Sequence, residues 1–208
     1  MHNLQFGQKE INYLSTRDPK LGEIIKQIGM LSRETNPDIF QSLVFSILGQ
    51  QISTKQHIKV WEKFCLLVHE VTPENVLATA PEEIRAIGVS GRKIKYIQEI
   101  ADKIIHKEFF PDELWELPDA EIRDRLLALK GVGDWTVEMI MIFSLGRLDV
   151  ISYKDFGIRR GMMLLYGYEE LTPEQFAQHA ATYSPYGTIA SLYLWELAAK
   201  GDPSKLGM

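Results

Sequence analysis

Apolar residues recur at helical spacing along almost the whole chain. Within each periodic segment they return every three or four positions, as expected for helices that bury one face. The predicted helices are Pro37–Gln51, Thr54–Val68, Arg92–Ile105, Asp119–Leu127, Asp134–Leu145, Asp155–Leu165, Pro173–Thr182 and Pro185–Ala199. Only Asp149–Ile151 has the character of an extended segment. The pattern therefore predicts an all-α protein.

Capping patterns mark where several of these helices begin. Ser53 precedes one helix, and Thr72-Pro73-Glu74, Ala80-Pro81-Glu82 and Thr172-Pro173-Glu174 each combine a capping position, a proline in the first turn and an early acid. No repeat, low-complexity tract or flexible linker is visible in the sequence. We therefore expect any subdomains to be packed closely together rather than tethered.

Composition is that of a soluble globular protein. The 208 residues are 45% hydrophobic and 25% charged, which is enough to bury a sizeable core. The longest apolar runs are too short or too interrupted to span a bilayer, and the chain does not begin with a signal pattern. We expect a cytoplasmic protein without a membrane partner, associated with the nucleoid in a prokaryote. The single cysteine, Cys65, can form neither an internal disulfide nor an iron–sulfur cage, and its apolar surroundings favour a buried structural thiol.

The charge balance does not by itself indicate a nucleic-acid partner. The formal net charge is −5, whereas DNA-binding domains are usually basic as a whole. Local patches can override that average. Arg92-Lys93 with Lys95, and Arg159-Arg160, are candidate positive spots, although each pattern also suits a solvated helix face.

The segment Leu127–Thr136 joins two predicted helices through Gly131 and Gly133. Glycine gives the backbone freedom that a tight turn between helices needs. Such a turn leaves amide N–H groups unpaired at the start of the next helix, where the helix dipole favours an anion such as a DNA phosphate. A backbone grip of this kind holds DNA without reading its sequence. A Gly-x-Gly corner also occurs in proteins that bind no nucleic acid, so the motif alone leaves both interpretations open.

Five segments together resemble the helix-hairpin-helix DNA glycosylases. They are Gln50-Gln51-Ile52-Ser53, Gly88–Lys93, Leu129–Thr136, Asp149–Gly161 and Tyr186–Trp195. The likeness extends in order from about Pro37 to Ala199 and is closest to the 3-methyladenine DNA glycosylase II branch. It implies two helical subdomains with the active site in the cleft between them. We expect residues 36–147 to form the central subdomain, ending in the helix-hairpin-helix motif. Residues 1–35, with one N-terminal helix, and residues 148–208 should form the second.

By this resemblance Asp155 is the catalytic residue. Alkylated purines carry positive charge and leave readily, so the sugar develops oxocarbenium character that a carboxylate stabilises while it orients or deprotonates water. The alternative is that Asp155 only caps a helix, and both roles can coexist. The chain departs from the usual family pattern in Ser152, where a proline is common, and in Lys154, where an acid is common. A lysine beside Asp155 would favour its ionised form if the side chains approach.

The resemblance also implies a hydrolase without strand-cutting activity. Related enzymes that cut the strand carry a nucleophilic lysine where this chain has Trp135, and an indole is not a nucleophile. Trp135 and Trp195 match positions that face the extruded base, where an indole attracts a cationic purine. Met139 and Tyr186 are further candidates for this base pocket, and Glu138 is a candidate for the cleft lining. The alternatives are core packing for the aromatic residues and methionine, and a solvated or salt-bridged Glu138.

Further implied DNA contacts lie in three turns. The candidates are Gly131, Val132, Gly133 and Thr136 of the hairpin, with Gln51 and Ser90 elsewhere. In the family, the turn corresponding to Val89-Ser90-Gly91 inserts a wedge side chain into the duplex, but Gly91 at its apparent tip has none. Val89 or Ser90 remains as a candidate. Backbone carbonyls of Leu127, Leu129 and Val132 are candidates for holding a structural Na⁺ or K⁺.

Together these points predict a monomeric, monofunctional glycosylase that removes alkylated purines of the 3-methyladenine type from damaged double-stranded DNA in base excision repair. No redox cofactor or iron–sulfur cluster is implied. Two alternatives stay open: a non-catalytic helix-hairpin-helix DNA-binding protein, or a glycosylase for a different base lesion.

Overall fold

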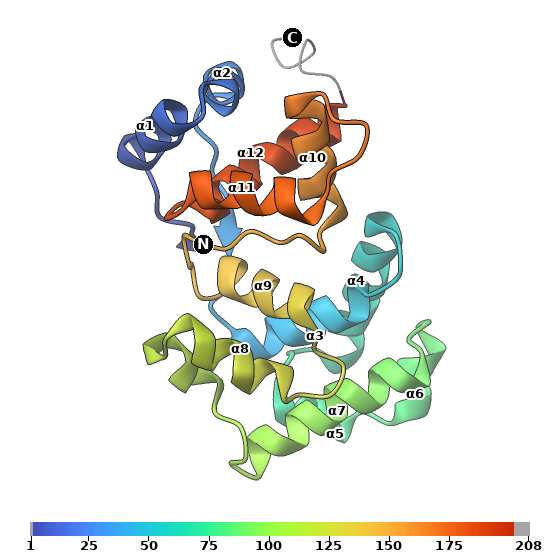
Figure 1. The fold of residues 1–208 in the computed structure, drawn as a ribbon. Helices are drawn as coiled ribbons and strands as arrows, with labels where there is room; N and C mark the ends of the chain where they lie inside the picture. The colour runs from blue at the N-terminus through green and yellow to red at the C-terminus, as the bar shows by residue number, and fades with distance from the viewer. Residues whose placement is uncertain (1, 202–208) are drawn as a thin grey trace. The chain divides into compact units, whose positions relative to one another are not determined.

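The described residues, 2–201, are almost entirely helical in this computed structural model (Figure 1). Within this range the strand structure consists of two residue pairs, His2–Asn3 (β1) and Glu34–Thr35 (β2), which pair antiparallel. The all-α fold expected from the apolar pattern is therefore confirmed. None of the described helices combines the length and the apolar character needed to cross a membrane.

The chain divides into two compact units. One is Asn36–Ile140, and the other consists of the residues up to Thr35 together with those from Met141 onward. The division falls within helix α9 (Asp134–Phe143), before Arg147, where the sequence analysis ended the central subdomain.

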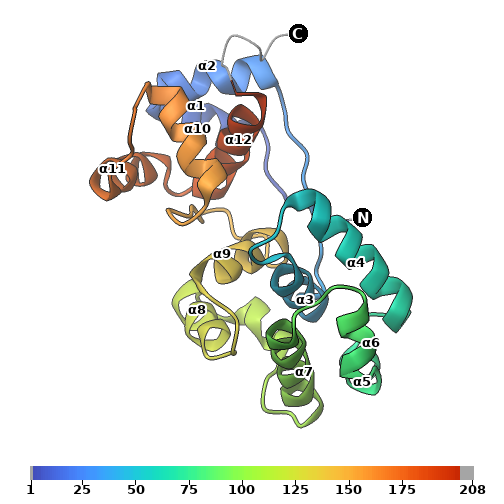
Figure 2. The same cartoon turned by 90° about the vertical axis from the view of Figure 1, so that its right-hand side faces the viewer.

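The unit Asn36–Ile140 is built around two long helices, α3 and α7. Its helices are α3 (Ile39–Gly49), α4 (Thr54–Val68), α5 (Pro73–Ala78), α6 (Pro81–Ala86), α7 (Gly91–Ile105), a 3-10 turn η1 (Pro111–Glu116), α8 (Asp119–Leu127) and the start of α9. α3 is apolar along most of its length and packs on α4 and α7. α7 buries Ile94, Ile97 and Ile100 at helical spacing and contacts α5 and α6 (Figure 2).

The other unit is organised by its last helix. Its helices are α1 (Gln8–Arg17), α2 (Pro19–Ile28), α10 (Phe156–Tyr166), α11 (Pro173–Tyr183) and α12 (Gly187–Lys200). In α12 every residue from Gly187 to Leu194 is buried. α10 packs closely on α12 at Gly161, where an added Cβ would lie 2.3 Å from the carbonyl oxygen of Leu194. A glycine is therefore required at this crossing.

A buried polar network ties α2 to α10 and α11. Asp18 caps α2 by accepting a hydrogen bond from the backbone N–H of Leu21, and it also accepts one from the hydroxyl of Tyr166. The hydroxyls of Tyr166 and Tyr183 are 2.6 Å apart. Burial is the main cause that raises the pKa of both tyrosines. Both hydroxyls therefore stay protonated and able to donate, which satisfies the buried carboxylate.

Three local expectations differ from the structure. Asp149–Ile151 is not a strand, because the backbone N–H of Val150 donates to Thr188 Oγ1 at 2.9 Å and not to a neighbouring strand. The N-terminal region holds two helices and not one, separated at the capping residue Asp18. Cys65 is only partly buried, but burial raises the pKa of its thiol, which agrees with an unreactive role.

Candidate active site

Asp155 is the N-cap residue of α10. Its Oδ1 accepts a hydrogen bond from the backbone N–H of Ile158 at 2.9 Å and another from Trp195 Nε1 at 2.8 Å. A carboxylate at this end of a helix is stabilised by the helix dipole. Two donors on one oxygen also fix the direction of the carboxylate group. The capping role considered from the sequence is thus present, and it supplies the orientation that a catalytic role needs.

The segment before Asp155 is fastened to the first turn of α12. Asp149 Oδ1 accepts from the backbone N–H of Gly187 at 3.0 Å, and Asp149 Oδ2 accepts from Ser184 Oγ at 2.6 Å. The buried Thr188 accepts from the Val150 amide and donates to the carbonyl of Arg147 at 2.7 Å. Side chains therefore bind the backbone of this irregular segment in place of a sheet partner.

Ser152 departs from the family pattern, and the structure shows the environment of its side chain. Its side chain is fully buried, and its hydroxyl has no hydrogen-bond partner among the described residues. Leaving a buried hydroxyl unsatisfied costs about 1–3 kcal/mol. The proline common at this position in the family would bury no such group, so Ser152 is a locally unfavourable choice in this loop.

Trp195 does more than the sequence indicated. Its indole is half-buried and stacks on Phe143, with ring centroids 5.8 Å apart and an interplanar angle of 26°. Gly157 makes room for it, since an added Cβ there would lie 2.7 Å from Trp195 Cδ1. The indole N–H faces Asp155, so Trp195 is a direct partner of the predicted catalytic carboxylate. Its predicted contact with the base stays a prediction.

Phe156 is a candidate that the sequence analysis missed. It follows Asp155 directly, occupies the first position of α10, and is 74% exposed. The buried face of α10 is formed by Ile158, Gly161 and Met162, and Phe156 does not belong to it. A large apolar residue outside the buried face of its helix was the available signal. An exposed aromatic ring beside the carboxylate is suited to stacking on a nucleotide.

The helix-hairpin-helix turn is residues 128–133, between α8 and α9. Gly131 has φ +83°, and an added Cβ there would lie 2.2 Å from the ring of Tyr96. Gly133 is exposed, and an added Cβ would meet nothing within 4 Å. Gly131 is therefore required by the fold, whereas Gly133 leaves an open approach to the backbone, as a phosphate contact needs.

The other hairpin candidates differ in how far their side chains are buried. Val132 is 8% exposed and Thr136 is 2% exposed. Their side chains are covered by protein, so a phosphate contact through the Thr136 hydroxyl is not supported, and only backbone groups of the turn remain as donors. Trp135, at the start of α9, is 36% exposed. It keeps the accessible surface that a contact with a base requires.

Two further predicted contacts are exposed in the same unit. Gln51 follows α3 and has φ +57°, a conformation that a non-glycine residue rarely adopts. Strained backbone of this kind is concentrated at functional sites. Ser90 is the N-cap residue of α7 and is exposed. Val89 is 3% exposed and cannot serve as a wedge, which leaves Ser90 as the side chain at this turn.

Met139, Tyr186 and Glu138 fit their alternative roles better. Met139 is buried in α9, and Tyr186 packs edge-on against Tyr13 with ring centroids 5.1 Å apart. Glu138 lies 3.7 Å from Arg123, which also binds Asp134 at 2.9 Å. The salt-bridged interpretation of Glu138 is therefore the observed one. The sequence analysis missed Arg123, because the predicted turn makes α8 and α9 neighbours but does not show which of their side chains meet.

The described side chains offer no metal-binding cluster. Among residues 2–201 the His, Cys, Asp and Glu side chains form no group of three or more that suits a metal ion. A monovalent cation would instead use backbone carbonyls of the hairpin. The Leu129 carbonyl already accepts from the Val132 amide at 3.2 Å, but a carbonyl has two lone pairs and can take a second partner. The turn thus remains compatible with such an ion.

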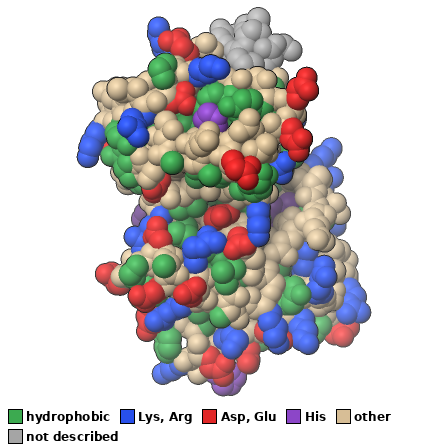
Figure 3. All heavy atoms as spheres, viewed as in Figure 1, with side chains coloured by type: hydrophobic (Ala, Val, Ile, Leu, Met, Phe, Trp, Pro, Cys, Tyr) green, Lys and Arg blue, Asp and Glu red, His purple; other side chains and the backbone are tan. Residues whose placement is uncertain are grey.

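Charges on the face shown in Figure 3 are mixed in sign. Lys and Arg side chains are interspersed with Asp and Glu, in keeping with the net charge of −5. Asp155, Trp195, Phe143 and Phe156 belong to one unit, and the hairpin, Gln51 and Ser90 belong to the other. A DNA contact on this face would therefore depend on local groups and not on a broad positive field.

Known proteins resemble this chain both in sequence and in fold. Residues 44–185 match the family described as "HhH-GPD superfamily base excision DNA repair protein". DNA-3-methyladenine glycosylase 1 of Schizosaccharomyces pombe is 29% identical over 202 residues, covering 93% of this chain and 88% of the relative. The crystal structure of a DNA-3-methyladenine glycosidase from Bacillus halodurans is 34% identical with a TM-score of 0.84, covering 99% of both chains. The S. pombe 3-methyladenine DNA glycosylase in complex with abasic DNA is 29% identical with a TM-score of 0.82, covering 91% of this chain and 96% of that one.

Proposed function

The chain belongs to the HhH-GPD superfamily of base excision DNA repair proteins, and on this basis we propose that it is an alkylpurine DNA glycosylase that uses Asp155 as its catalytic carboxylate. Its relatives named DNA-3-methyladenine glycosylase support this assignment along most of the chain. The observation that carries the catalytic proposal is the oriented carboxylate: Asp155 Oδ1 receives N–H donors from Ile158 and Trp195. The substrate class is alkylated purine of the 3-methyladenine type.

The reaction is hydrolysis of the N-glycosidic bond. The bond between the sugar C1′ and the purine nitrogen breaks, and the departing base keeps the electron pair, which neutralises its positive charge. The oxygen of a water molecule then bonds to C1′, and its surplus proton passes to the carboxylate or to solvent. Asp155 stabilises the oxocarbenium-like sugar electrostatically and orients the water. The fixed direction of its carboxylate means that little reorganisation is needed during the reaction.

The enzyme is monofunctional under this proposal. Strand cutting requires an amine that attacks C1′ and forms a Schiff base, and Trp135 stands at the corresponding place. An indole cannot form that adduct. Trp135 instead offers an exposed aromatic surface that attracts a cationic purine by about 0.5–2 kcal/mol, depending on desolvation. Trp195 is the second indole proposed to face the base, whereas Met139 and Tyr186 are left to the packing roles in which they are observed.

Damaged double-stranded DNA is the proposed partner, bound by one monomer. The S. pombe relative in complex with abasic DNA supports DNA as the ligand. We assign the backbone of Gly131, Val132 and Gly133 to a phosphate, with a Na⁺ or K⁺ held by nearby carbonyls as an optional bridge. Gln51 and Ser90 are assigned to the duplex beside the extruded base, where an amide or hydroxyl can replace lost hydrogen bonds.

One assay tests this function against its alternatives. The protein is incubated with methylated duplex DNA, and free 3-methyladenine and 7-methylguanine are measured, with unmethylated duplex as the control. We expect release from methylated DNA only. Binding without release from any damaged duplex would favour a non-catalytic DNA-binding protein, which the capping role of Asp155 allows. Release of a different damaged base alone would assign the enzyme to another substrate class.

Borohydride reduction during the reaction tests the subtype. A Schiff base is trapped by borohydride as a covalent protein–DNA adduct, whereas direct hydrolysis by water leaves nothing to trap. We expect no adduct. A trapped complex would contradict the argument from Trp135.

A further inference from the structure

One face of α7 contacts the segments proposed to hold DNA. Lys93, Tyr96 and Glu99 are spaced three residues apart, which places them on the same side of the helix. Each reaches a different part of the DNA-binding region proposed above: the end of α3 before Gln51, the glycine of the hairpin, and the lysine at the hairpin tip. α7 itself begins directly after Ser90.

Lys93 binds the end of α3 and is not directed to a DNA phosphate. Its Nζ donates to the carbonyl of Leu48 at 2.8 Å and to the carbonyl of Gln50 at 2.7 Å. These carbonyls lie at the helix C-terminus, where no intrahelical donor is available and where the dipole favours a cation. Burial, with a smaller effect of Arg92, lowers the pKa of Lys93. Lys93 is thus a helix cap, and its role as a positive spot on the surface is not supported.

Gln50 continues the connection from α3 to the hairpin. Its side-chain Nε2 donates to the carbonyl of Gly131 at 2.8 Å. The same residue therefore receives Lys93 on its backbone carbonyl and binds the hairpin with its side chain. Gln51, the next residue, is held at φ +57°. A residue in such a conformation persists only where its surroundings determine it, and the Lys93 and Gln50 bonds supply that restraint.

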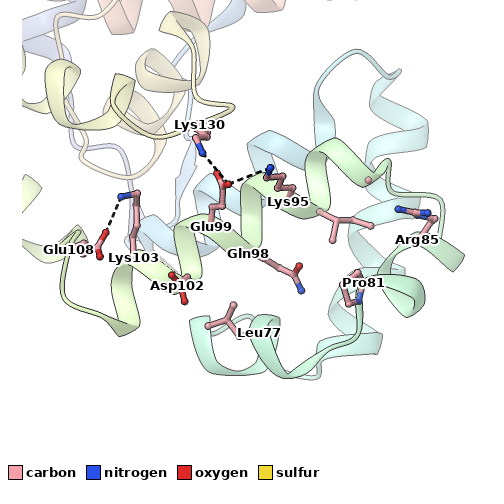
Figure 4. A pocket seen from close by; sticks show the side chains of 12 residues that line it. Leu77, Pro81, Arg85, Lys95, Gln98, Glu99, Asp102, Lys103, Glu108 and Lys130 are labelled. Carbon is pink, nitrogen blue, oxygen red and sulfur yellow. Dashed lines mark hydrogen bonds and ion pairs between the residues drawn. The ribbon is translucent and has the colours of Figure 1, made fainter.

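Tyr96 and Glu99 complete the contact with the hairpin. The Tyr96 ring lies against Gly131 so closely that no Cβ fits between them. Glu99 binds Lys130 at 3.1 Å and Lys95 at 4.0 Å, as Figure 4 shows. Glu99, Lys95 and Lys130 also border a cavity of about 530 Å³.

We propose that Lys93 and Gln50 are positioning residues that hold the hairpin and the Gln51 turn at a fixed separation, so that both engage one DNA duplex at once. This inference rests on the proposed function. Neither residue touches DNA in this account. Their effect is to order two turns before binding, which removes the cost of ordering them during binding.

The central test compares Lys93→Met with Lys93→Arg and with Lys103→Met. Lys103 lies on the same helix but pairs with Glu108 and holds no backbone carbonyl. Affinity is measured on a duplex containing an abasic analogue. We expect Lys93→Met to weaken binding about tenfold, because the two turns must then be ordered during binding. Lys93→Arg should recover most of the affinity, and Lys103→Met should behave as wild type. Equal loss in Lys93→Met and Lys103→Met would indicate simple electrostatics and overturn the proposal.

Coupling between the two residues gives a second test. Gln50→Ala alone should also weaken binding, and the double variant with Lys93→Met should be little worse than the stronger single variant, because both act through one connection. Fully additive losses would contradict a shared role. Gln50→Ala also guards against the case in which Lys93→Met fails to fold.

Hydrogen exchange separates this proposal from the proposed function. In the absence of DNA, the amide of Val132, which donates to the carbonyl of Leu129, should exchange faster in Lys93→Met and Gln50→Ala than in wild type. Unchanged exchange and unchanged affinity would overturn the positioning role even if wild-type base release is normal. Conversely, faster exchange in the variants of a protein that releases no base would support the positioning role and refute the proposed glycosylase function.

Discussion

Trp195 Nε1 donates a hydrogen bond to Asp155 Oδ1 at 2.8 Å, across 40 positions of sequence. The same indole stacks on Phe143, and it approaches Asp155 through the space left by Gly157. An aromatic residue that was expected only to line a base pocket therefore also sets the direction of the predicted catalytic carboxylate.

Trp195→Phe should slow base release while leaving the fold intact. Phenylalanine keeps an aromatic ring against Phe143 but cannot donate to Asp155. A hydrogen bond to a charged group contributes about 1.5–3 kcal/mol, so we expect the single-turnover rate to fall about tenfold or more. The control is Trp115→Phe, at a residue that is 40% exposed in the other unit. A wild-type rate in Trp195→Phe would show that this hydrogen bond does not assist catalysis.

Phe156→Ala should reduce activity without reducing stability. Phe156 is 74% exposed, and exposed side chains contribute within about 0.5 kcal/mol to the free energy of unfolding. Stacking of an aromatic ring on a base is worth about 1–3 kcal/mol, which corresponds to a loss of roughly tenfold in release from damaged DNA. Leu66→Ala is the matched control, because Leu66 is 77% exposed on α4. Equal activity in the two variants would remove Phe156 from the site.

The two hairpin glycines should respond differently to alanine. Gly131→Ala places a methyl group in the Tyr96 ring at φ +83°, so we expect a lower melting temperature together with weaker DNA binding. Gly133→Ala meets no protein atom within 4 Å, and its melting temperature should stay near wild type. Its DNA affinity should still fall, because the methyl group occupies the approach to the backbone. Wild-type affinity in Gly133→Ala would argue against a phosphate contact at this turn.

Much of the helical pattern could be predicted from the sequence. α4 and α8 have the expected bounds, because the apolar period of each lies within a short window, and α4 also has the predicted cap at Ser53. The resemblance to helix-hairpin-helix glycosylases is confirmed by the family match over residues 44–185. The hairpin glycines could also be identified from the sequence, because glycine is the residue type that a tight turn between helices requires.

The partners of the site residues could not be predicted. Periodicity reports which face of a helix is buried but not which distant residue covers it, so neither the contact of Trp195 with Asp155 nor that of Lys93 with α3 was foreseen. The sequence predicts a surface charge at Lys93, because a lysine in an amphipathic helix usually lies on the solvated face. Burial of Thr136 and Val89 likewise depends on packing, which a single sequence does not contain.

Acid should destabilise the protein through two histidines. Burial lowers the pKa of His57 and of His179 from the ordinary value of 6.5. At pH values just below 6.5, each histidine therefore takes up a proton when the protein unfolds. The contribution of the two neutral histidines to the free energy of unfolding is fully present above pH 6.5 and is lost as the pH falls below it. Between about pH 7.5 and about 5.5, the melting temperature of His57→Gln should fall less than that of wild type. His2→Gln, at an exposed position, is the control. An identical fall in all three proteins would refute this account.

The most direct test of the central claim is release of 3-methyladenine from methylated duplex DNA by Asp155→Asn. Asparagine still caps a helix and can still accept from Ile158 and Trp195, so the fold and DNA binding should persist. The charge that stabilises the oxocarbenium ion is lost, and we expect release to fall by orders of magnitude. Release at the wild-type rate by a folded, DNA-binding Asp155→Asn protein would contradict the catalytic assignment.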